Sequence, residues 1–382
     1  MSFDFKRRLV GLQEKMEELG LDLVVYGSCQ NFQYLTGLLF DWRHGIDLGG
    51  QANNIFVPRE GEPILTLGEE WSEQAAHTWV REIRTLEGKD NFGRLIRKVI
   101  SDLELTPKNV GIGDHVWGST IIEIAEAVKK SVFYKAEHLM DHVRMIKDTG
   151  EVGRLRKVAE LTDKAVETVT GEIKKGATQQ QIQIEVEFEG RRLGASDVSF
   201  PATVGFVKSG SEITPNPFTY PKEKGLVPGT SIAFDVGFVL DGYCSDFGRS
   251  FYFGPAGKEV KKGYEALQQS VVETVEKMKR GSMRVCDIFP TIEKTLDRLG
   301  YGDYLRARLQ TKSVGHNIGV EVHEPPWLSP EFDETLQSNM VMALEPKIWH
   351  KGEYYLRVED IVLVGPRKTE FLTNFDRKLF QL

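Results

Sequence analysis

The N-terminal third of the chain alternates between helical and strand-like hydrophobic patterns. Residues 4–19 place apolar side chains at helical spacing and stop at Gly20, and the apolar run over 22–26 predicts a strand. Short apolar runs near 53–57 and 63–67 predict further strands. Helical patterns follow near 70–80, 91–103 and 119–130. This alternation predicts an α/β domain over residues 1–145.

A second domain is predicted over residues 150–382, after a boundary within 144–150. It opens with a helical pattern from Glu151 to Lys175, which Gly176 ends. Thr178 is placed to cap another helix that runs to about Leu193. Residues 199–253 and 311–364 have strand and loop character, and 258–299 predict two more helices. The second domain therefore mixes helices with many strands.

One predicted hairpin of this domain carries two aspartates among apolar residues. Asp241-Gly242 is a strong signal for a two-residue turn. If the flanking residues pair, Asp246 faces Gly237, which shares a face with Asp235. The two carboxylates then lie on one side of the ribbon, about 7–8 Å apart at the backbone. Burying unpaired carboxylates is costly, so a cation is expected beside them.

Three later segments carry polar residues of the same kind. An extended segment rich in glycine and valine holds His316 and His323, and a predicted strand ends at Glu345. The next strand carries Glu359, and a hairpin centred near Gly352 places it opposite Glu345. Two strand pairs are thus expected to bring four carboxylates and a histidine to one cavity.

The charge of this predicted cluster suits two divalent metal ions. Four carboxylates and two divalent cations balance, with the imidazole neutral. Oxygen ligands with a single histidine favour manganese, and allow cobalt, iron or zinc, over a metal that prefers thiolates. Such a pair of ions would activate a bridging water as a nucleophile and polarise a carbonyl group.

These motifs resemble those of the metallopeptidase family of prolidase, aminopeptidase P and methionine aminopeptidase, whose fold creatinase shares. The resemblance covers the region 150–382, and Asn31-Phe-Gln-Tyr-Leu-Thr-Gly37 resembles the early signature of creatinase-type N-terminal domains. It implies a pseudo-symmetric pita-bread domain with a curved antiparallel sheet. It also implies five metal ligands, namely Asp235, Asp246, His316, Glu345 and Glu359.

The resemblance implies roles for other residues as well. Glu345 would double as the general base, and His323 would face the substrate and stabilise the tetrahedral intermediate. Arg357 and Arg249 would orient the ligating carboxylates. The N-terminal domain would form a homodimer and help to close the pocket, with Asp41-Trp-Arg-His44 as the stretch nearest the partner's site.

Three positions depart from the family pattern. The family has a histidine upstream of the first aspartate, whereas segment 209–219 has none; counting back gives Phe218, and the local motif gives Asn216. Asn216 either donates a hydrogen bond to a substrate carbonyl or is a turn residue between two prolines. Trp327 replaces the arginine of dipeptide-selective prolidases and either stacks on substrate or packs in the core. Lys347 replaces a glycine.

These observations favour a dinuclear-metal hydrolase that cleaves Xaa-Pro amide bonds, as an Xaa-Pro dipeptidase or aminopeptidase P, through a metal-bridging hydroxide. An alternative is an enzyme of the same fold that acts on a small non-peptide, such as a creatine-like or ectoine-like compound or dimethylsulfoniopropionate. A non-catalytic peptide-binding scaffold is a third hypothesis, although such scaffolds have generally lost their ligands.

Composition excludes several other classes. The 382 residues carry a net charge of −7, and the basic residues are scattered, so no nucleic-acid-binding surface is predicted. No apolar run approaches the ~18 residues that span a membrane, and no secretory signal is recognised. The three cysteines are widely spaced without a pairing or metal-binding pattern. We therefore expect a cytoplasmic enzyme that acts on a small peptide or small molecule.

Overall fold

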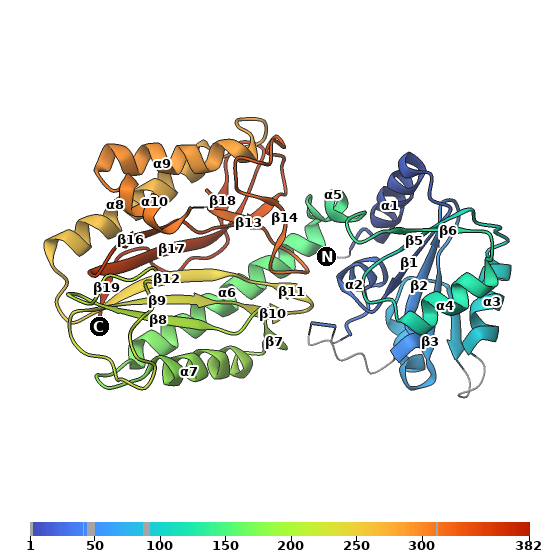
Figure 1. Ribbon diagram of the computed structural model, residues 1–382, viewed down its shortest axis with the longest axis horizontal. Helices are drawn as coiled ribbons and strands as arrows, with labels where there is room; N and C mark the ends of the chain where they lie inside the picture. The colour runs from blue at the N-terminus through green and yellow to red at the C-terminus, as the bar shows by residue number, and fades with distance from the viewer. Residues whose placement is uncertain (1–2, 41, 44–49, 87–91, 311) are drawn as a thin grey trace. The chain divides into compact units, whose positions relative to one another are not determined.

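The chain forms two compact units in the computed structural model, Phe3–Val143 and Arg144–Leu382. The structure describes residues 3–40, 42–43, 50–86, 92–310 and 312–382 (Figure 1). Asp41 and His44, two of the residues expected near a partner's site, lie outside these ranges.

The N-terminal unit is a six-stranded mixed sheet with helices. Its strands lie in the order β4-β3-β2-β1-β5-β6. They are β1 (Leu23–Gly27), β2 (Asn54–Pro58), β3 (Ile64–Gly68), β4 (Glu82–Leu86), β5 (Asn109–Ile112) and β6 (Val132–Lys135). The helices are α1 (Phe5–Leu19), α2 (Gln30–Thr36), α3 (Phe92–Asp102), α4 (Gly118–Ala127) and α5 (Asp141–Arg144). The α/β prediction is confirmed for this unit.

One predicted helix of this unit differs in type. The segment predicted as a helix near 70–80 is a 3₁₀-helix, η2 (Glu69–His77), and a shorter one, η1 (Gly50–Ala52), precedes β2. None of the η2 residues is buried. Most of a helix's stability in a protein comes from burying an apolar face, so this segment lacks the packing that would favour a regular α-helix.

The C-terminal unit is a large curved sheet flanked by helices (Figure 1). The main sheet runs in the order β14-β13-β15-β17-β12-β9-β8, with β16 and β18 paired to β17 and β19 paired to β12. Its helices are α6 (Thr149–Glu172), α7 (Gln179–Arg192), α8 (Lys258–Lys277), η3 (Val285–Asp287), α9 (Ile288–Leu299) and α10 (Gly302–Arg308).

The strands of this unit are short except for β17. They are β7 (Asp197–Val198), β8 (Thr203–Lys208), β9 (Thr230–Val236), β10 (Phe238–Leu240), β11 (Tyr243–Cys244), β12 (Phe247–Phe253), β13 (Gly315–Asn317), β14 (Glu324–Trp327), β15 (Val341–Leu344), β16 (Lys347–His350), β17 (Tyr354–Leu363), β18 (Glu370–Phe371) and β19 (Phe380–Gln381). Strands β7, β10 and β11 form a separate small sheet.

Capping explains where the first two helices of this unit begin. Asp148 caps α6, and Thr178 caps α7 as predicted; both are capping boxes, in which the third helical residue bonds back to the cap.

The short helix α10 is an addition to the elements predicted from the sequence.

The first predicted hairpin has the expected register. Asp241 and Gly242 have φ angles of 50° and 79°, as a type I′ turn requires. Leu240 pairs with Tyr243, and the same register continues into β9 and β12, where Asp235 pairs with Gly248.

The second predicted hairpin is confirmed as well. Leu344 pairs with Asp360 and Lys347 pairs with Arg357. Glu345 therefore lies opposite Glu359, and Gly352, with a φ of 75°, lies in the turn.

The helices cover one face of the main sheet, and the predicted ligands on its strands project from the other. Ile232, Phe234 and Val236 of β9 pack in a core with residues of α6 and α7. Leu356 and Val358 of β17 pack in a core with residues of α8, α9 and α10. Because side chains alternate along a strand, residues 235, 357 and 359 project from the opposite face.

None of the helices in the part of the chain that the structure describes combines the length and apolar character needed to cross a bilayer.

Candidate metal centre

The residues predicted as ligands come from five neighbouring strands of one sheet. Asp235 lies on β9, Asp246 immediately precedes β12, Glu359 lies on β17, Glu345 follows β15, and His316 lies on β13. These strands are adjacent in the order β13-β15-β17-β12-β9. The topology therefore brings together residues that are up to 124 positions apart in the chain, between 235 and 359.

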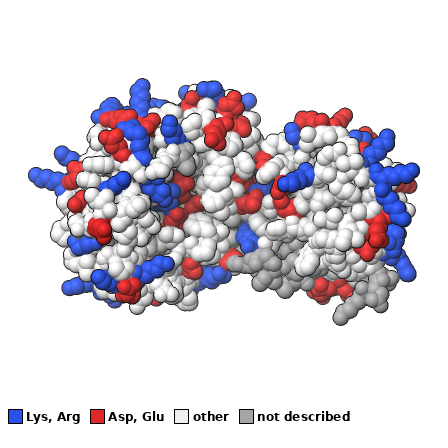
Figure 2. All heavy atoms as spheres, viewed as in Figure 1, with Lys and Arg blue, Asp and Glu red and all other residues white. Residues whose placement is uncertain are grey.

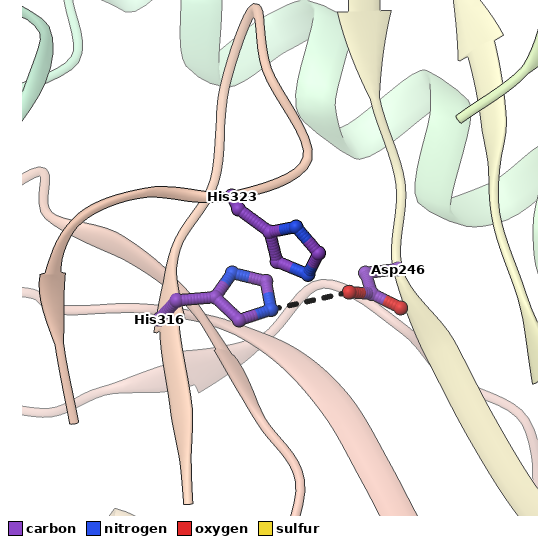
Figure 3. A group of neighbouring side chains, drawn as sticks. All are labelled: Asp246, His316 and His323. Carbon is purple, nitrogen blue, oxygen red and sulfur yellow. Dashed lines mark ion pairs between the residues drawn. The ribbon is translucent and has the colours of Figure 1, made fainter. Parts of the chain in front are cut away.

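One group of ligand atoms lies at the histidine side of the site. Asp246, His316 and His323 each offer an atom within 4.8 Å of the others. The rings of His316 and His323 converge on the Asp246 carboxylate, and His316 Nε2 lies 3.3 Å from Asp246 Oδ2 (Figure 3). His316 Nε2 is also 3.9 Å from Glu345 Oε1.

A second group lies at the aspartate side of the site. Asp235, Asp246 and Glu359 also offer ligand atoms within 4.8 Å of one another. Asp246 belongs to both groups. A carboxylate shared in this way is what two neighbouring ions need if they are to be held together.

Several buried ligand atoms make no hydrogen bond within the described chain, and their chemistry can be compared with that of metal ligands. Asp246 Oδ1, His316 Nε2 and both carboxylate oxygens of Glu359 are buried and make no hydrogen bond to a described residue. Buried polar atoms are normally satisfied, so these atoms require an unseen partner. Oxygen donors with an imidazole nitrogen suit a divalent cation, and the residues therefore fit the metal pair.

Gly248 provides the room for this cluster. It pairs with Asp235 on one side and with Glu359 on the other. A Cβ atom at this position would collide with the side chains of Arg357 and Glu359. The absence of a side chain here keeps the space between the two carboxylates open, a feature that the sequence motifs alone did not reveal.

Mutual repulsion and burial shift the pKa values of the carboxylates. Burial, and then the charges of Asp235 and Glu345, raise the pKa of Asp246 well above its ordinary value. Burial and the Asp246 charge do the same to the pKa of Glu359. Burial also acts to raise the pKa of Glu345, but Lys347 and Arg357 outweigh it and hold that pKa at about 2. Asp246 and Glu359 therefore have less neighbouring positive charge than Glu345 has.

Arg357 and Arg249 contact the cluster differently. Arg357 forms ion pairs with Asp235, with Glu345 and with Glu359, the last two at 3.3 Å. Arg249 instead pairs with Asp360 at 2.8 Å and donates a hydrogen bond to the backbone oxygen of Glu359. Arg357 thus touches the carboxylates directly, whereas Arg249 fixes the strand that carries one of them.

The residues predicted to contact substrate lie in contrasting places. Trp327 is 38% exposed and stacks on His323, with ring centroids 5.4 Å apart. Asn216 is exposed in a turn, where its side-chain oxygen accepts a hydrogen bond from the Phe218 backbone. Phe218 packs edge-on against Tyr355 at 4.8 Å. Trp327 therefore joins the histidine side of the site, and Asn216 is engaged in its own turn.

Two ion-pair contacts near the site were not predicted from the sequence. Lys347 forms an ion pair with Glu345, which its unusual place after Glu-Pro could have suggested. Glu324, next to His323, is buried between Arg144 at 2.8 Å and Lys147 at 3.1 Å. No local pattern pairs residues so far apart in sequence. Figure 2 shows acidic and basic side chains gathered together over the strands of this unit.

Two family models match the chain. Residues 153–366 match the model of metallopeptidase family M24. Residues 8–146 match the creatinase/prolidase N-terminal domain.

Several known proteins match this chain over nearly its full length. The "Putative dipeptidase YkvY" of Bacillus subtilis is 28% identical, over 98% of this chain and 99% of its own. A prolidase of Thermococcus sibiricus has a TM-score of 0.81 at 26% identity, and the match covers 100% of both chains. An Xaa-Pro dipeptidase of Bacillus anthracis has a TM-score of 0.83 at 24% identity, over 99% of this chain and 100% of its own.

Proposed function

Because the chain belongs to metallopeptidase family M24, we propose that it uses two divalent metal ions to hydrolyse the amide bond between a residue and a following proline. The observation that carries this proposal is a cluster of four carboxylates and His316, in which several buried ligand atoms make no hydrogen bond to a described residue. Relatives named as a dipeptidase, a prolidase and an Xaa-Pro dipeptidase support the substrate class.

Asp235, Asp246 and Glu359, which form one group of ligand atoms, would hold one ion. Asp246, His316 and Glu345, which adjoin one another, would hold the other. Manganese is the first ion to test, with cobalt, iron and zinc as alternatives for this oxygen-rich ligand set. When bound, such ions supply a water nucleophile of lowered pKa and polarise a carbonyl group.

The chain's own residues supply the other steps. Glu345 is ionised at neutral pH, because its pKa is held at about 2. Its carboxylate would accept a proton from the attacking water, whose own pKa bound ions would lower. Burial and the neighbouring His316 lower the pKa of His323. His323 is therefore neutral and can donate a ring N–H to the carbonyl oxygen as negative charge develops there. Trp327, stacked beside it, offers an apolar face to a proline ring.

A single substrate panel tests this proposal. Purified protein loaded with manganese is incubated with Xaa-Pro dipeptides, Xaa-Pro-Yaa tripeptides, and the same peptides with proline replaced by alanine. We expect cleavage only before proline. The ratio of dipeptide to tripeptide rates then separates prolidase from aminopeptidase P activity.

A second candidate is hydrolysis or elimination on a small non-peptide by the same site. It is favoured by segment 209–219, where no histidine faces the metal cluster, Asn216 is held in a turn, and Phe218 packs on Tyr355. Cleavage of none of the peptides by protein with a full metal content would contradict the first proposal and support this one.

A further inference from the structure

Lys347 holds an unusual place beside the metal cluster. It begins β16 directly after Glu345-Pro346, and its residue is only 8% exposed. Its ammonium group forms an ion pair with Glu345 Oε2, while Glu345 Oε1 lies toward His316. A buried lysine is uncommon unless it has a partner. The partner of Lys347 is Glu345, the residue proposed to accept the proton of the attacking water.

An apolar wall adjoins Lys347 on the same face of the sheet. Lys347 pairs with Arg357, and the next pair on this face is Trp349 with Tyr355. Phe218 packs against the same aromatic cluster. Lys347 therefore lies between the charged metal cluster and a buried aromatic cluster, next to the groups proposed to act on the substrate.

Lys347 leaves the loaded site with surplus positive charge. The four carboxylates balance two divalent ions, so Arg357 and Lys347 add two uncompensated positive charges. The nucleophile accounts for one of them at most. A buried charge without a partner is costly, so an anionic group is needed when substrate binds.

We propose that Lys347 binds a carboxylate group of the substrate and gives the enzyme a preference for peptides that carry one. This inference rests on the proposed peptidase function. Arg357 pairs with three carboxylates, Asp235, Glu345 and Glu359, whereas the ion pair of Lys347 within the described chain is with Glu345. Trp327 carries no charge. The carboxylate is either the C-terminal group of a dipeptide or an acidic side chain before proline; both present the same chemistry to an ammonium group.

Two matched pairs of substrates separate these sources in the wild-type enzyme. Ala-Pro is compared with its amide Ala-Pro-NH₂, and Glu-Pro-NH₂ with Gln-Pro-NH₂. A preference in the first pair identifies the terminal carboxylate, and a preference in the second identifies the acidic side chain. Equal kcat/KM within both pairs would overturn the proposal without recourse to any variant.

Variants then assign the preference to Lys347. Lys347→Met is expected to reduce it by about tenfold or more, mainly through KM, because one charge-assisted hydrogen bond is lost. Lys347→Arg keeps the charge and is expected to retain most of it. Lys164→Met is the matched control, since Lys164 is exposed on α6 and pairs with Glu160. A preference that persists in Lys347→Met would refute the assignment.

An equilibrium measurement separates this inference from the proposed function. Calorimetric titration of the metal-loaded protein with L-proline and with L-prolinamide reports carboxylate binding without catalysis, and metal content is measured for each variant because Lys347 contacts Glu345. Where the terminal carboxylate is the ligand, L-proline binds more tightly to wild type and loses that advantage in Lys347→Met. If no peptide is cleaved, the peptidase proposal fails, and titration decides for Lys347 once Glu-Pro-NH₂ and Gln-Pro-NH₂ are titrated in the same way. Equal binding within both pairs of ligands overturns the inference.

Discussion

At the scale of single residues, Asp246 contributes to both groups of ligand atoms. Asp246→Asn keeps the size of the side chain but removes one charge and one ligating oxygen. We expect it to abolish uptake of both ions and to reduce Xaa-Pro hydrolysis below detection. Metal analysis and the peptide assay test this. The matched control is Asp241→Asn, the same change in the exposed hairpin turn, which should leave both unchanged. Activity in Asp246→Asn would contradict the two-metal proposal.

Asp246 also predicts how the metal-free protein responds to pH. Its pKa is raised in the folded state, so the folded protein binds the proton more tightly than the unfolded chain does. Stability is therefore lost as pH rises above 3.8, the ordinary value for aspartate. With chelator present, Asp246→Asn should melt at a higher temperature than wild type near neutral pH. The difference should shrink on acidification; thermal melts that show a constant gap would argue against this.

His323 should act on the rate rather than on metal retention. We expect His323→Ala to lower kcat by about 10²–10³-fold, the usual loss when a donor to a developing oxyanion is removed. Its metal content and KM should change little. His350→Ala is the control, because His350 stacks on Tyr304 at 4.6 Å instead. Loss of metal in His323→Ala would indicate a ligand role, which the 4.8 Å grouping with Asp246 and His316 also permits.

The sequence predicted the placement of the proposed ligands better than the contacts around them. Asp235, Asp246 and Glu359 were foreseen because strand alternation and turn position fix which side chains share a face. Lys347 against Glu345 was not, because a lysine after a strand is usually solvated. The hydrogen bond in the turn of Asn216 was not predicted either, because several backbone conformations of that segment would have allowed it.

At the scale of elements, both hairpins have the predicted register because their turns were recognisable in sequence. Asp241-Gly242 specifies a two-residue turn, and Gly352 marks the centre of the other. Segment η2 was predicted as a helix from its hydrophobic pattern, but none of its residues is buried, and it forms a 3₁₀-helix. Pairing of β12 with β19 joins Phe251 to Phe380, and no local pattern encodes such a distant contact.

The segment that carries His323 is held by a buried ion-pair network. Although burial acts to raise the pKa of Glu324, Arg144 and then Lys147 hold it at about 2, against an ordinary 4.5. This shift corresponds to about 3 kcal/mol of stability. Glu324→Gln should cost a similar amount near neutral pH, because it removes the buried carboxylate that Arg144 and Lys147 share, and should lower activity by displacing His323. Urea unfolding measures the loss.

The pH dependence identifies the cause of that loss. The contribution of Glu324 is present above pH 4.5 and disappears as pH falls toward about 2, since the folded-state pKa is depressed. The stability gap between wild type and Glu324→Gln should therefore close over this range. Glu160→Gln removes a carboxylate from an exposed pair with Lys164 and serves as the control, with little expected change. A gap independent of pH would point to packing rather than charge.

At the scale of the whole molecule, each unit has its own hydrophobic core. Residues of β1, β5, α3 and α4 form one in the N-terminal unit, and two others flank the large sheet. All the proposed ligands belong to the unit Arg144–Leu382. The N-terminal unit therefore contributes no metal ligand in this proposal, and its expected role is association with a second copy.

The edge strand β6 is the place where we expect that association. It ends the described N-terminal sheet, and Val132 and Tyr134 on one of its faces are 54% and 47% exposed. An exposed apolar edge strand is a template for pairing with another chain. We expect light scattering to give a mass twice the 43.2 kDa of one chain. Val132→Glu combined with Tyr134→Glu should halve that mass.

The metal site should survive this change, because its ligands all lie in the other unit. The double variant should therefore keep the rise in melting temperature that manganese produces in wild type. Phe188→Glu is the matched control, since Phe188 is 62% exposed on α7, and it should remain a dimer. A wild-type monomer would refute association itself, and an intact dimer in the double variant would exclude the β6 edge as its interface. Loss of peptide hydrolysis in a monomer that still binds manganese would show that the active site needs the second copy.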